Sequence, residues 1–500
     1  MNQKKTFLIF IVILIAILPI IAASCSENSA PSKSSNNGEN SNAAEDNDPA
    51  LLADPKEKYN PNFAPVDMQG YVFIFGTRDN AGVYHGGVAA HTRDLYAEAE
   101  NGELINDAVF RRNMTIEEKY NCKIEMEDFP EDDEARANKV VERCVKAGDK
   151  SFDLLMTHMH LGTNTAVMGC FYDIAKFPNI DLSKPYWNEG ATEGYSINYR
   201  LYIGLSDLSF STNENLYCMF FNKELTNNYN VENPYALVKN NKWTFDKFNE
   251  IIRMGYVDIN GDGKQDEWDQ YGYISTAAVN FLWSGGSHVM AKDEYDIPYL
   301  DFLNQRTIDI YEKTYSIVNN EYTYSKETNW HTGNTIGQFR NSGGVFYGNQ
   351  LCRVNELRDT AFDFGIVPYP KYDEAQERYY SYVDGHASMM AIPLNLPNPE
   401  WTGLIIEELS YLSYKDVLPP YYDVVLNVKL VRDEESVKTL EILFDSKVFD
   451  PSYVLGGDFW VMWNDNIASK KTEIVSTYEK KYPASLAAIQ KKIDALLELP

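Results

Sequence analysis

The sequence predicts an α/β protein of two lobes. Short apolar runs of strand type alternate with helical patterns of about 10–15 residues, an order typical of a largely parallel sheet covered by helices. From about residue 67 onward the composition is globular, with aromatic residues throughout. This part of the chain is roughly 430 residues long, more than one hydrophobic core usually supports. We therefore expect two α/β lobes.

The first part of the globular region shows the clearest alternation. Tyr71-Val72-Phe73-Ile74-Phe75, which Gly76 ends, is the continuous apolar run of a buried parallel strand. Further strands are predicted at residues 123–126 and 152–156, and helices at residues 106–120 and 134–146.

Helices dominate the C-terminal part of the sequence. Earlier, Thr244 is expected to cap a helix that carries Phe245 and Phe248 and that Gly255 ends. In the last hundred residues, apolar faces predict helices at residues 403–414, 434–446, 467–478 and 484–497, the last of them opening after Pro483.

The first 25 residues predict export and attachment to a membrane. Lys4-Lys5, an apolar run over residues 7–21 and the small residues Ala22-Ala23-Ser24 describe a secretory signal over residues 1–24. Cys25 follows at the position of a bacterial lipobox, where the cysteine is diacylated and holds the chain on the surface. The alternative is a transmembrane anchor, which needs roughly 20 apolar residues. We expect the protein to lie at the extracellular face of the cell membrane and to contact the membrane through its lipid anchor only.

Composition bounds the remaining possibilities. Residues 25–65 begin with a stretch rich in Ser, Asn, Glu and Pro, which predicts a disordered tether. The formal net charge of −28 without a basic stripe argues against a nucleic-acid partner. Five cysteines follow Cys25, none in a CxxC pair, and we expect them to be buried small apolar residues.

Several segments of the globular region form a pattern through their order and spacing. They are Ile105-Asn106-Asp107-Ala108-Val109 with residues 111–113 and 117–121, Phe152-Asp153-Leu154-Leu155, Phe220-Phe221-Asn222-Lys223, Trp243-Thr244-Phe245-Asp246-Lys247-Phe248, residues 363–376 and residues 386–393. Together these segments resemble the extracellular solute-binding proteins of ABC importers, most of all the carbohydrate-binding group (family 1). The resemblance covers roughly residues 71–500.

This resemblance implies a type II, two-lobed periplasmic-binding-protein-like fold with the ligand in a cleft between the lobes. The N-terminal lobe would take residues 66–218 and 384–420, and the C-terminal lobe residues 219–383 and 421–500. It also implies a monomer without enzymatic activity, which captures a sugar or oligosaccharide by hinge closure and delivers it to permease subunits. No cofactor is required for this.

A sugar site needs flat aromatic faces and planar polar groups. His158 and His160 follow the strand at residues 152–156, at the strand end where ligands bind in α/β sheets, although hydrogen-bonded loop histidines are an equal alternative. By position along the family pattern, the resemblance adds the candidates Asn215, Trp283, Tyr347, Asp384, His386 and Trp460.

A separate motif predicts a structural Ca²⁺ site. It fits the twelve-residue calcium loop, with Gly263 at the sharp turn and Lys264 offering its carbonyl. It ends in Asp where EF-hands carry a longer Glu, and the alternative is a polar turn that binds nothing. The proposed ligands are Asp258, Asn260, Asp262, Lys264, Asp266 and Asp269.

Three alternative functions stay open. A secreted enzyme acting on polysaccharide is one, although the sequence has no GxSxG, HExxH or P-loop motif. A binding protein for peptides is the second. A sensor that reports its bound state to a membrane kinase is the third, and it uses the same hinge closure.

Overall fold

The structure is a computed structural model that describes residues 54–78, 93–129, 134–325, 335–385, 387–427 and 434–499. The predicted signal peptide, the tether up to residue 53, the lipidation site Cys25 and the candidate ligand residue His386 lie outside these ranges. For His158 and His160 the structure describes the backbone but not the side chain.

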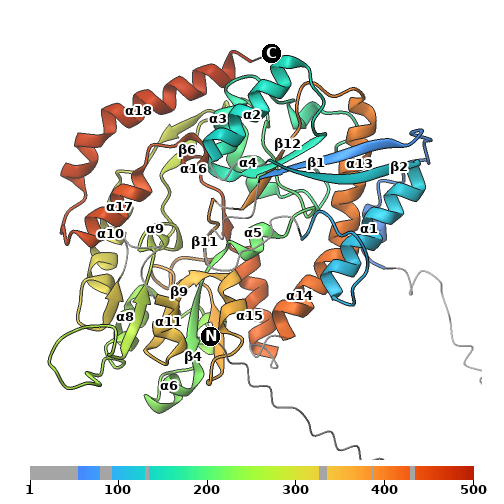
Figure 1. Ribbon diagram of the computed structural model, residues 1–500. Helices are drawn as coiled ribbons and strands as arrows, with labels where there is room; N and C mark the ends of the chain where they lie inside the picture. Colours follow the sequence, from blue (N-terminus) through green and yellow to red (C-terminus); the bar gives the residue numbers. More distant parts are fainter. Residues whose placement is uncertain are drawn as a thin grey trace, which may run out of the picture. The chain divides into compact units, whose positions relative to one another are not determined.

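The first lobe is built on a four-stranded sheet with the order β12-β3-β1-β2. β1, β2 and β3 run parallel, and β12 joins β3 in the antiparallel sense. The predicted strands and helices of this region are confirmed. The strands are β1 (Tyr71–Arg78), β2 (Cys122–Phe129), β3 (Leu154–His158) and β12 (Ser388–Ala391); the helices are α1 (Leu104–Tyr120), α2 (Glu134–Ala147), α3 (Met159–Ala166), α4 (Glu189–Tyr195), α5 (Ser211–Glu214), α13 (Pro399–Leu412) and α14 (Leu418–Asn427) (Figure 1).

The second lobe has a five-stranded mixed sheet with the order β10-β4-β9-β5-β8. β4 lies antiparallel to both β9 and β10, whereas β5 runs parallel to β8 and β9. The strands are β4 (Tyr217–Asn222), β5 (Tyr271–Ser275), β8 (Thr323–Ser325), β9 (Gly344–Gln350) and β10 (Phe364–Val367); the helices are α6 (Lys223–Asn228), α7 (Pro234–Lys239), α8 (Phe245–Ile252), α9 (Asn280–Ser284), α10 (Gln305–Val318), α11 (Thr335–Arg340), α12 (Val354–Leu357) and α15 (Glu434–Asp445).

Two of the chain crossings between the lobes pair with each other. Leu216, on the way into the second lobe, forms an antiparallel bridge with Val383, on the way back. Beside this bridge the Asp384 N–H donates to the Asn215 carbonyl at 2.9 Å. We call this paired region of the two crossings the hinge. Because its partners are backbone groups, the hinge fixes the register of the two crossings whatever side chains they carry.

The chain crosses between the lobes again near its C-terminus. β13 (Lys447–Val448) pairs in parallel with β11 (Ser381–Tyr382), beside the hinge. α16 (Ser452–Leu455) then packs on α3 of the first lobe, and α17 (Phe459–Ala468) returns to the second lobe, where Phe459 stacks on Phe302.

The last helix, α18 (Val475–Leu497), lies across both lobes (Figure 1). Near its start Tyr478 stacks on Phe302 of the second lobe, with ring centroids 5.3 Å apart. Just beyond its end the Leu499 carbonyl accepts a hydrogen bond from Arg200 of the first lobe. Among the described residues, neither this helix nor any other has the length and apolarity to cross a membrane.

The C-terminal helix boundaries differ from those predicted. We expected helices at residues 467–478 and 484–497, but α17 ends at Ala468 and α18 runs through Pro483 without a break. Its buried residues Tyr478, Ile489 and Ile493 lie on both sides of Pro483. Burial of this continuous apolar face outweighs the one backbone hydrogen bond that proline removes.

Gly255 also has a different role from the predicted one. α8 is capped by Thr244, whose side chain accepts from the Lys247 N–H as expected, but the helix ends at Ile252. Gly255 instead lies against β5, where a Cβ would come within 2.6 Å of the Gly272 Cα. Glycine is therefore required here for close backbone packing. All five described cysteines are free, and four of them are buried, as predicted.

A hairpin of the second lobe contacts the first lobe away from the hinge. It consists of β6 (Met290–Lys292) and β7 (Pro298–Leu300), and we call its contact the latch. The Lys292 ammonium donates to the Ser196 carbonyl at 2.6 Å, to the Ser196 hydroxyl at 3.0 Å and to the Glu193 carbonyl. Asp296 of the hairpin pairs with Lys292 at 2.8 Å and accepts from the Tyr199 N–H at 2.8 Å. The latch therefore holds the lobes together by charge-assisted hydrogen bonds.

We expect Lys292→Met to weaken this contact by about 1.5–3 kcal/mol, because hydrogen bonds from a charged group are lost and their acceptors stay half-buried. The variant should populate a more open arrangement, visible as a larger radius of gyration in small-angle scattering. Lys313→Met is the matched control, since Lys313 pairs with Asp246 inside the second lobe at 2.8 Å. Equal radii for both variants and the wild type would contradict the latch.

Candidate ligand-binding site

A narrow pocket with a cavity volume of about 10 Å³ lies beside the hinge and opens to solvent. The crossings contribute Tyr217, Tyr382 and Asp384, so two of its walls are fixed by the backbone pairing described above. The segment after β5 and the start of α9 contribute further residues, as do α16 and α17. The full lining is Tyr217, Ala277, Val279, Trp283, Tyr382, Asp384, Tyr453 and Trp460.

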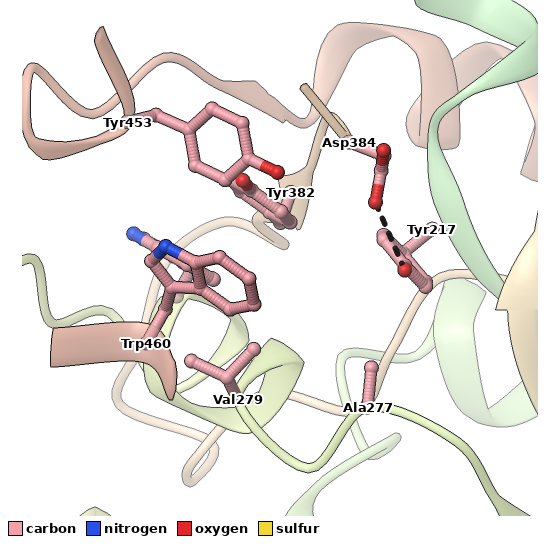
Figure 2. Close-up of a pocket in the computed structure, with 8 residues that line it drawn as sticks. Tyr217, Ala277, Val279, Tyr382, Asp384, Tyr453 and Trp460 are labelled. Carbon is pink, nitrogen blue, oxygen red and sulfur yellow. Dashed lines mark hydrogen bonds between the residues drawn. The ribbon is translucent and has the colours of Figure 1, made fainter. Parts of the chain in front are cut away.

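Aromatic rings form most of the pocket wall. Figure 2 shows Tyr382, Tyr453 and Trp460 on one side of the open space, with Tyr217 and Asp384 on the other. Neighbouring rings touch: Tyr382 lies 5.1 Å from Tyr453, and Tyr453 lies 6.2 Å from Trp460, measured between ring centroids. Ala277 and Val279 close the lower side with apolar groups (Figure 2).

Trp283 is the anchor of this wall. Its ring stacks face to face on Tyr382, with centroids 3.9 Å apart and planes 8° apart. Its indole N–H donates to the Asp450 carboxylate at 3.1 Å, and Asp450 also accepts from the Val289 N–H at 2.6 Å. One face of Trp283 is thus covered by protein, and its main contribution is to hold Tyr382 in place.

Asp384 is the charged group of the pocket. It is buried, and the Tyr217 hydroxyl donates to its carboxylate at 3.1 Å. Burial, together with the negative charge of Asp384, raises the pKa of Tyr217 well above its ordinary value. Tyr217 therefore stays a neutral hydrogen-bond donor at physiological pH, and Asp384 offers oxygen atoms to a ligand.

The structure brings three of the predicted ligand residues together in this pocket: Trp283, Asp384 and Trp460. Asn215 lies at the hinge instead, fully buried, with its amide donating to the Ser211 carbonyl at 2.8 Å. Tyr347 lies in the core of the second lobe, where it stacks on Phe220 and Phe339. A tyrosine in a buried central strand packs inward, and no sequence signal distinguished it from a cleft residue.

The backbone places His158 and His160 at the predicted strand end. His158 is the last residue of β3 and pairs in register with Ser388 of β12, and α3 begins at the next residue.

Sequence reasoning missed three aromatic members of the wall, namely Tyr217, Tyr382 and Tyr453. A period-2 argument could have found one of them. Tyr382 comes two residues before Asp384, so the two share one face of an extended crossing.

A larger, more polar groove lies elsewhere between the lobes. It has a volume of about 870 Å³ and includes α4 and Asp207 of the first lobe and Lys447 of β13. Burial raises the pKa of Asp207 to about 7 and lowers that of Lys447 to about 8, while each charge partly offsets the shift of the other. The lining of this groove consists mostly of charged and loop residues. The aromatic pocket is therefore the better candidate for the ligand-binding site.

The predicted calcium loop forms a compact exposed turn. The Asp258 carboxylate accepts from the Gly261 and Gly263 N–H groups at 2.7 and 2.9 Å, and both glycines adopt positive φ. Asp269 is buried and accepts from the Ile259 N–H at 3.3 Å. In the part of the chain that the structure describes, no group of three or more His, Cys, Asp or Glu side chains is placed to hold a metal ion. Calcium binding by this loop stays a prediction.

Comparison with known proteins supports the fold. No protein-family model and no curated protein sequence match the chain. Among solved structures, a cyclo/maltodextrin-binding protein complexed with maltotetraose has a TM-score of 0.55 at 14% identity, over 85% of this chain and 99% of that chain. The cyclic α-maltosyl-1,6-maltose binding protein of Arthrobacter globiformis has a TM-score of 0.54 at 13% identity, over 86% and 99%. The ABC substrate-binding protein Lmo0181 of Listeria monocytogenes, in complex with cycloalternan, has 0.50 at 10% identity, over 85% and 98%.

These likenesses define the class of fold. Nearly the whole length of each solved protein is matched, although the identities are low. The chain therefore has the two-lobed, periplasmic-binding-protein-like α/β fold that its sequence predicts.

For the calcium loop we expect millimolar Ca²⁺ to raise the melting temperature of the wild type, because an ion that binds the folded state alone stabilises it. Removal of Ca²⁺ with a chelator should reverse the shift. Asp258→Ala should abolish the response, and Asp293→Ala in the hairpin turn serves as the control, since that carboxylate also accepts backbone N–H groups. An unchanged melting temperature for the wild type would show that the loop is a turn without a metal.

Proposed function

We propose that this chain is the extracellular, lipid-anchored substrate-binding component of an ABC importer, and that it captures a sugar or oligosaccharide. The observation that carries the proposal is the aromatic pocket at the hinge, which holds one buried carboxylate. The likeness to solved sugar-binding proteins supports it, since their ligands in the matched structures are maltotetraose and cycloalternan.

The chemistry of the pocket suits a sugar ring. Aromatic faces pack against the C–H faces of a pyranose, which are apolar, while its hydroxyl groups need acceptors and donors at the ring edge. Trp460 and Tyr453 provide such faces, and Asp384 and the Tyr217 hydroxyl provide the polar groups (Figure 2).

The position of the pocket couples binding to lobe movement. Its walls come from the hinge, the second lobe and the C-terminal helices, so a ligand contacts parts that move relative to one another. A ligand that binds the closed arrangement more tightly than the open one shifts the population toward closure. The permease subunits would then recognise the closed arrangement. We propose no catalytic step, because glycoside hydrolysis needs two carboxylates and Asp384 is the one carboxylate among the described residues of the pocket.

We expect a saccharide from a panel of mono- and oligosaccharides to raise the melting temperature of the purified protein. At a concentration of 100 times its Kd, such a ligand stabilises the folded state by about 2.7 kcal/mol. Trp460→Ala should remove most of the ligand-induced rise in melting temperature, because it removes an aromatic face of the pocket. Trp268→Ala is the matched control, since Trp268 is 68% exposed and lies in the predicted calcium loop.

Two results would overturn this proposal. One is a panel in which no saccharide stabilises the protein while a peptide does, which would make the chain a peptide receptor. The other is turnover of a chromogenic glycoside by the purified protein, which would make it an enzyme. Normal sugar binding combined with unimpaired uptake in a deletion strain would assign the chain to sensing instead of import.

For the anchor we expect Cys25→Ala to release the protein into the medium, because the acylated cysteine supplies the membrane attachment. The wild type should incorporate a radiolabelled fatty acid, and the variant should not. Cys144→Ala is the control, since Cys144 is a partly buried thiol of the globular part. A variant that stays with the membrane would argue for a transmembrane anchor.

A further inference from the structure

The polar groove between α4 and β13 carries charges of both signs on different segments. It has a volume of about 870 Å³. The first lobe contributes three carboxylates and one ammonium group to its lining, namely Glu189, Glu193, Asp207 and Lys184. The chain before β11 and the segment around β13 contribute two cationic groups and one carboxylate, namely Arg378, Lys447 and Asp445. The first-lobe side is therefore net negative and the other side net positive.

Asp207 and Lys447 are opposite charges that do not meet. Each attracts the other, and Lys56, which is not part of the lining, adds a smaller attraction to Asp207. Among the described residues, however, neither the Asp207 carboxylate nor the Lys447 ammonium has an ion-pair partner or a side-chain hydrogen bond. Arg378 donates to the Asp445 carbonyl at 2.9 Å, which is an uncharged partner. The groove thus keeps charges of both signs apart from each other.

A ligand with a charge at each end would compensate both groups. Asp207 and Lys447 are partly buried, and an uncompensated charge is costly there because water screens it less than at an open surface. A molecule that brings an ammonium group to Asp207 and a carboxylate to Lys447 forms a charge-assisted hydrogen bond at each end. A neutral ligand would leave both charges uncompensated.

We infer that this groove binds a short peptide with both ends free, its N-terminal ammonium at Asp207 and its C-terminal carboxylate at Lys447 and Arg378. Sites for drug-sized ligands have volumes of about 300–1,000 Å³, so the groove has room for more than a single amino acid. Phe444 and Phe449 add apolar surface to the polar lining, which suits the side chains of a peptide.

The groove is separate from the aromatic pocket. In the ribbon of β11 and β13, Ser381 pairs with Lys447 and Tyr382 pairs with Val448. Because successive residues of a strand point to opposite sides, Lys447 lines the groove while Tyr382 lines the pocket. The inference therefore goes beyond the proposed function, and each can fail without the other.

The test compares three forms of one tripeptide by calorimetric titration of the full-length protein at pH 7. They are trialanine, N-acetyl-trialanine and trialanine amide, so that either the ammonium group or the carboxylate is removed while the rest of the peptide stays the same. We expect a Kd about tenfold lower for trialanine than for either blocked form, because each blocked form loses one hydrogen bond between charged groups.

Two variants assign the two ends of the peptide. Asp207→Asn should remove the preference over the acetylated form but keep the preference over the amide. Lys447→Met should have the converse effect. Lys176→Met is the matched control, since Lys176 pairs with Asp173 at 3.3 Å outside the groove, and both preferences should persist in it. Should the Asp207 or Lys447 variant fail to fold, the three titrations of the wild type still decide whether both free ends are needed.

Trp460→Ala locates the peptide. This variant should weaken saccharide binding and leave the Kd for trialanine unchanged, because Trp460 lines the aromatic pocket and not the groove. If trialanine does not bind, or binds no more tightly than its blocked forms, the inference is wrong and the proposed function is unaffected. If Trp460→Ala abolishes trialanine binding, the peptide occupies the aromatic pocket, and both the inference and the proposed function fail.

Discussion

The hinge depends on a few backbone hydrogen bonds between two distant segments. Leu216 and Val383 are more than 160 positions apart, yet their bridge sets the position of everything that follows each crossing. Tyr217 and Asp384 each lie one residue beyond the bridge, and they form one side of the pocket, where the Tyr217 hydroxyl donates to the Asp384 carboxylate.

Several residues of the pocket also hold the protein together. Trp283 stacks on Tyr382 and bonds Asp450, which in turn accepts from the backbone of the second lobe near the latch hairpin. The wall of the pocket and the contact between lobes are thus joined through Asp450. Under the proposed function, a ligand in contact with Tyr382 would act on a group of packed residues that spans both lobes.

The sequence was sufficient to predict the two-lobed α/β architecture and some of the residues that line the pocket. Strands such as β1 and helices such as α1 were predictable because their apolar patterns are long and regular. Pro483 misled the prediction, since its local effect on a helix was weighed without the buried face that continues on both sides of it. Trp283, Asp384 and Trp460, chosen by their position along the family pattern, meet in one pocket, and their contact with a ligand stays a prediction. The sequence did not show that Tyr347 packs in the core while Tyr453 lines the pocket. The chain has 35 tyrosines, and only the fold decides which of them point inward or outward.

The helix that lies across both lobes has a mechanical consequence. α18 is fixed to the second lobe near Tyr478 and to the first lobe beyond Leu497, so relative rotation of the lobes must bend or twist it. Bending concentrates at Pro483, where one backbone hydrogen bond is missing. The stiffness of α18 on either side of Pro483 therefore opposes relative rotation of the two lobes that it contacts.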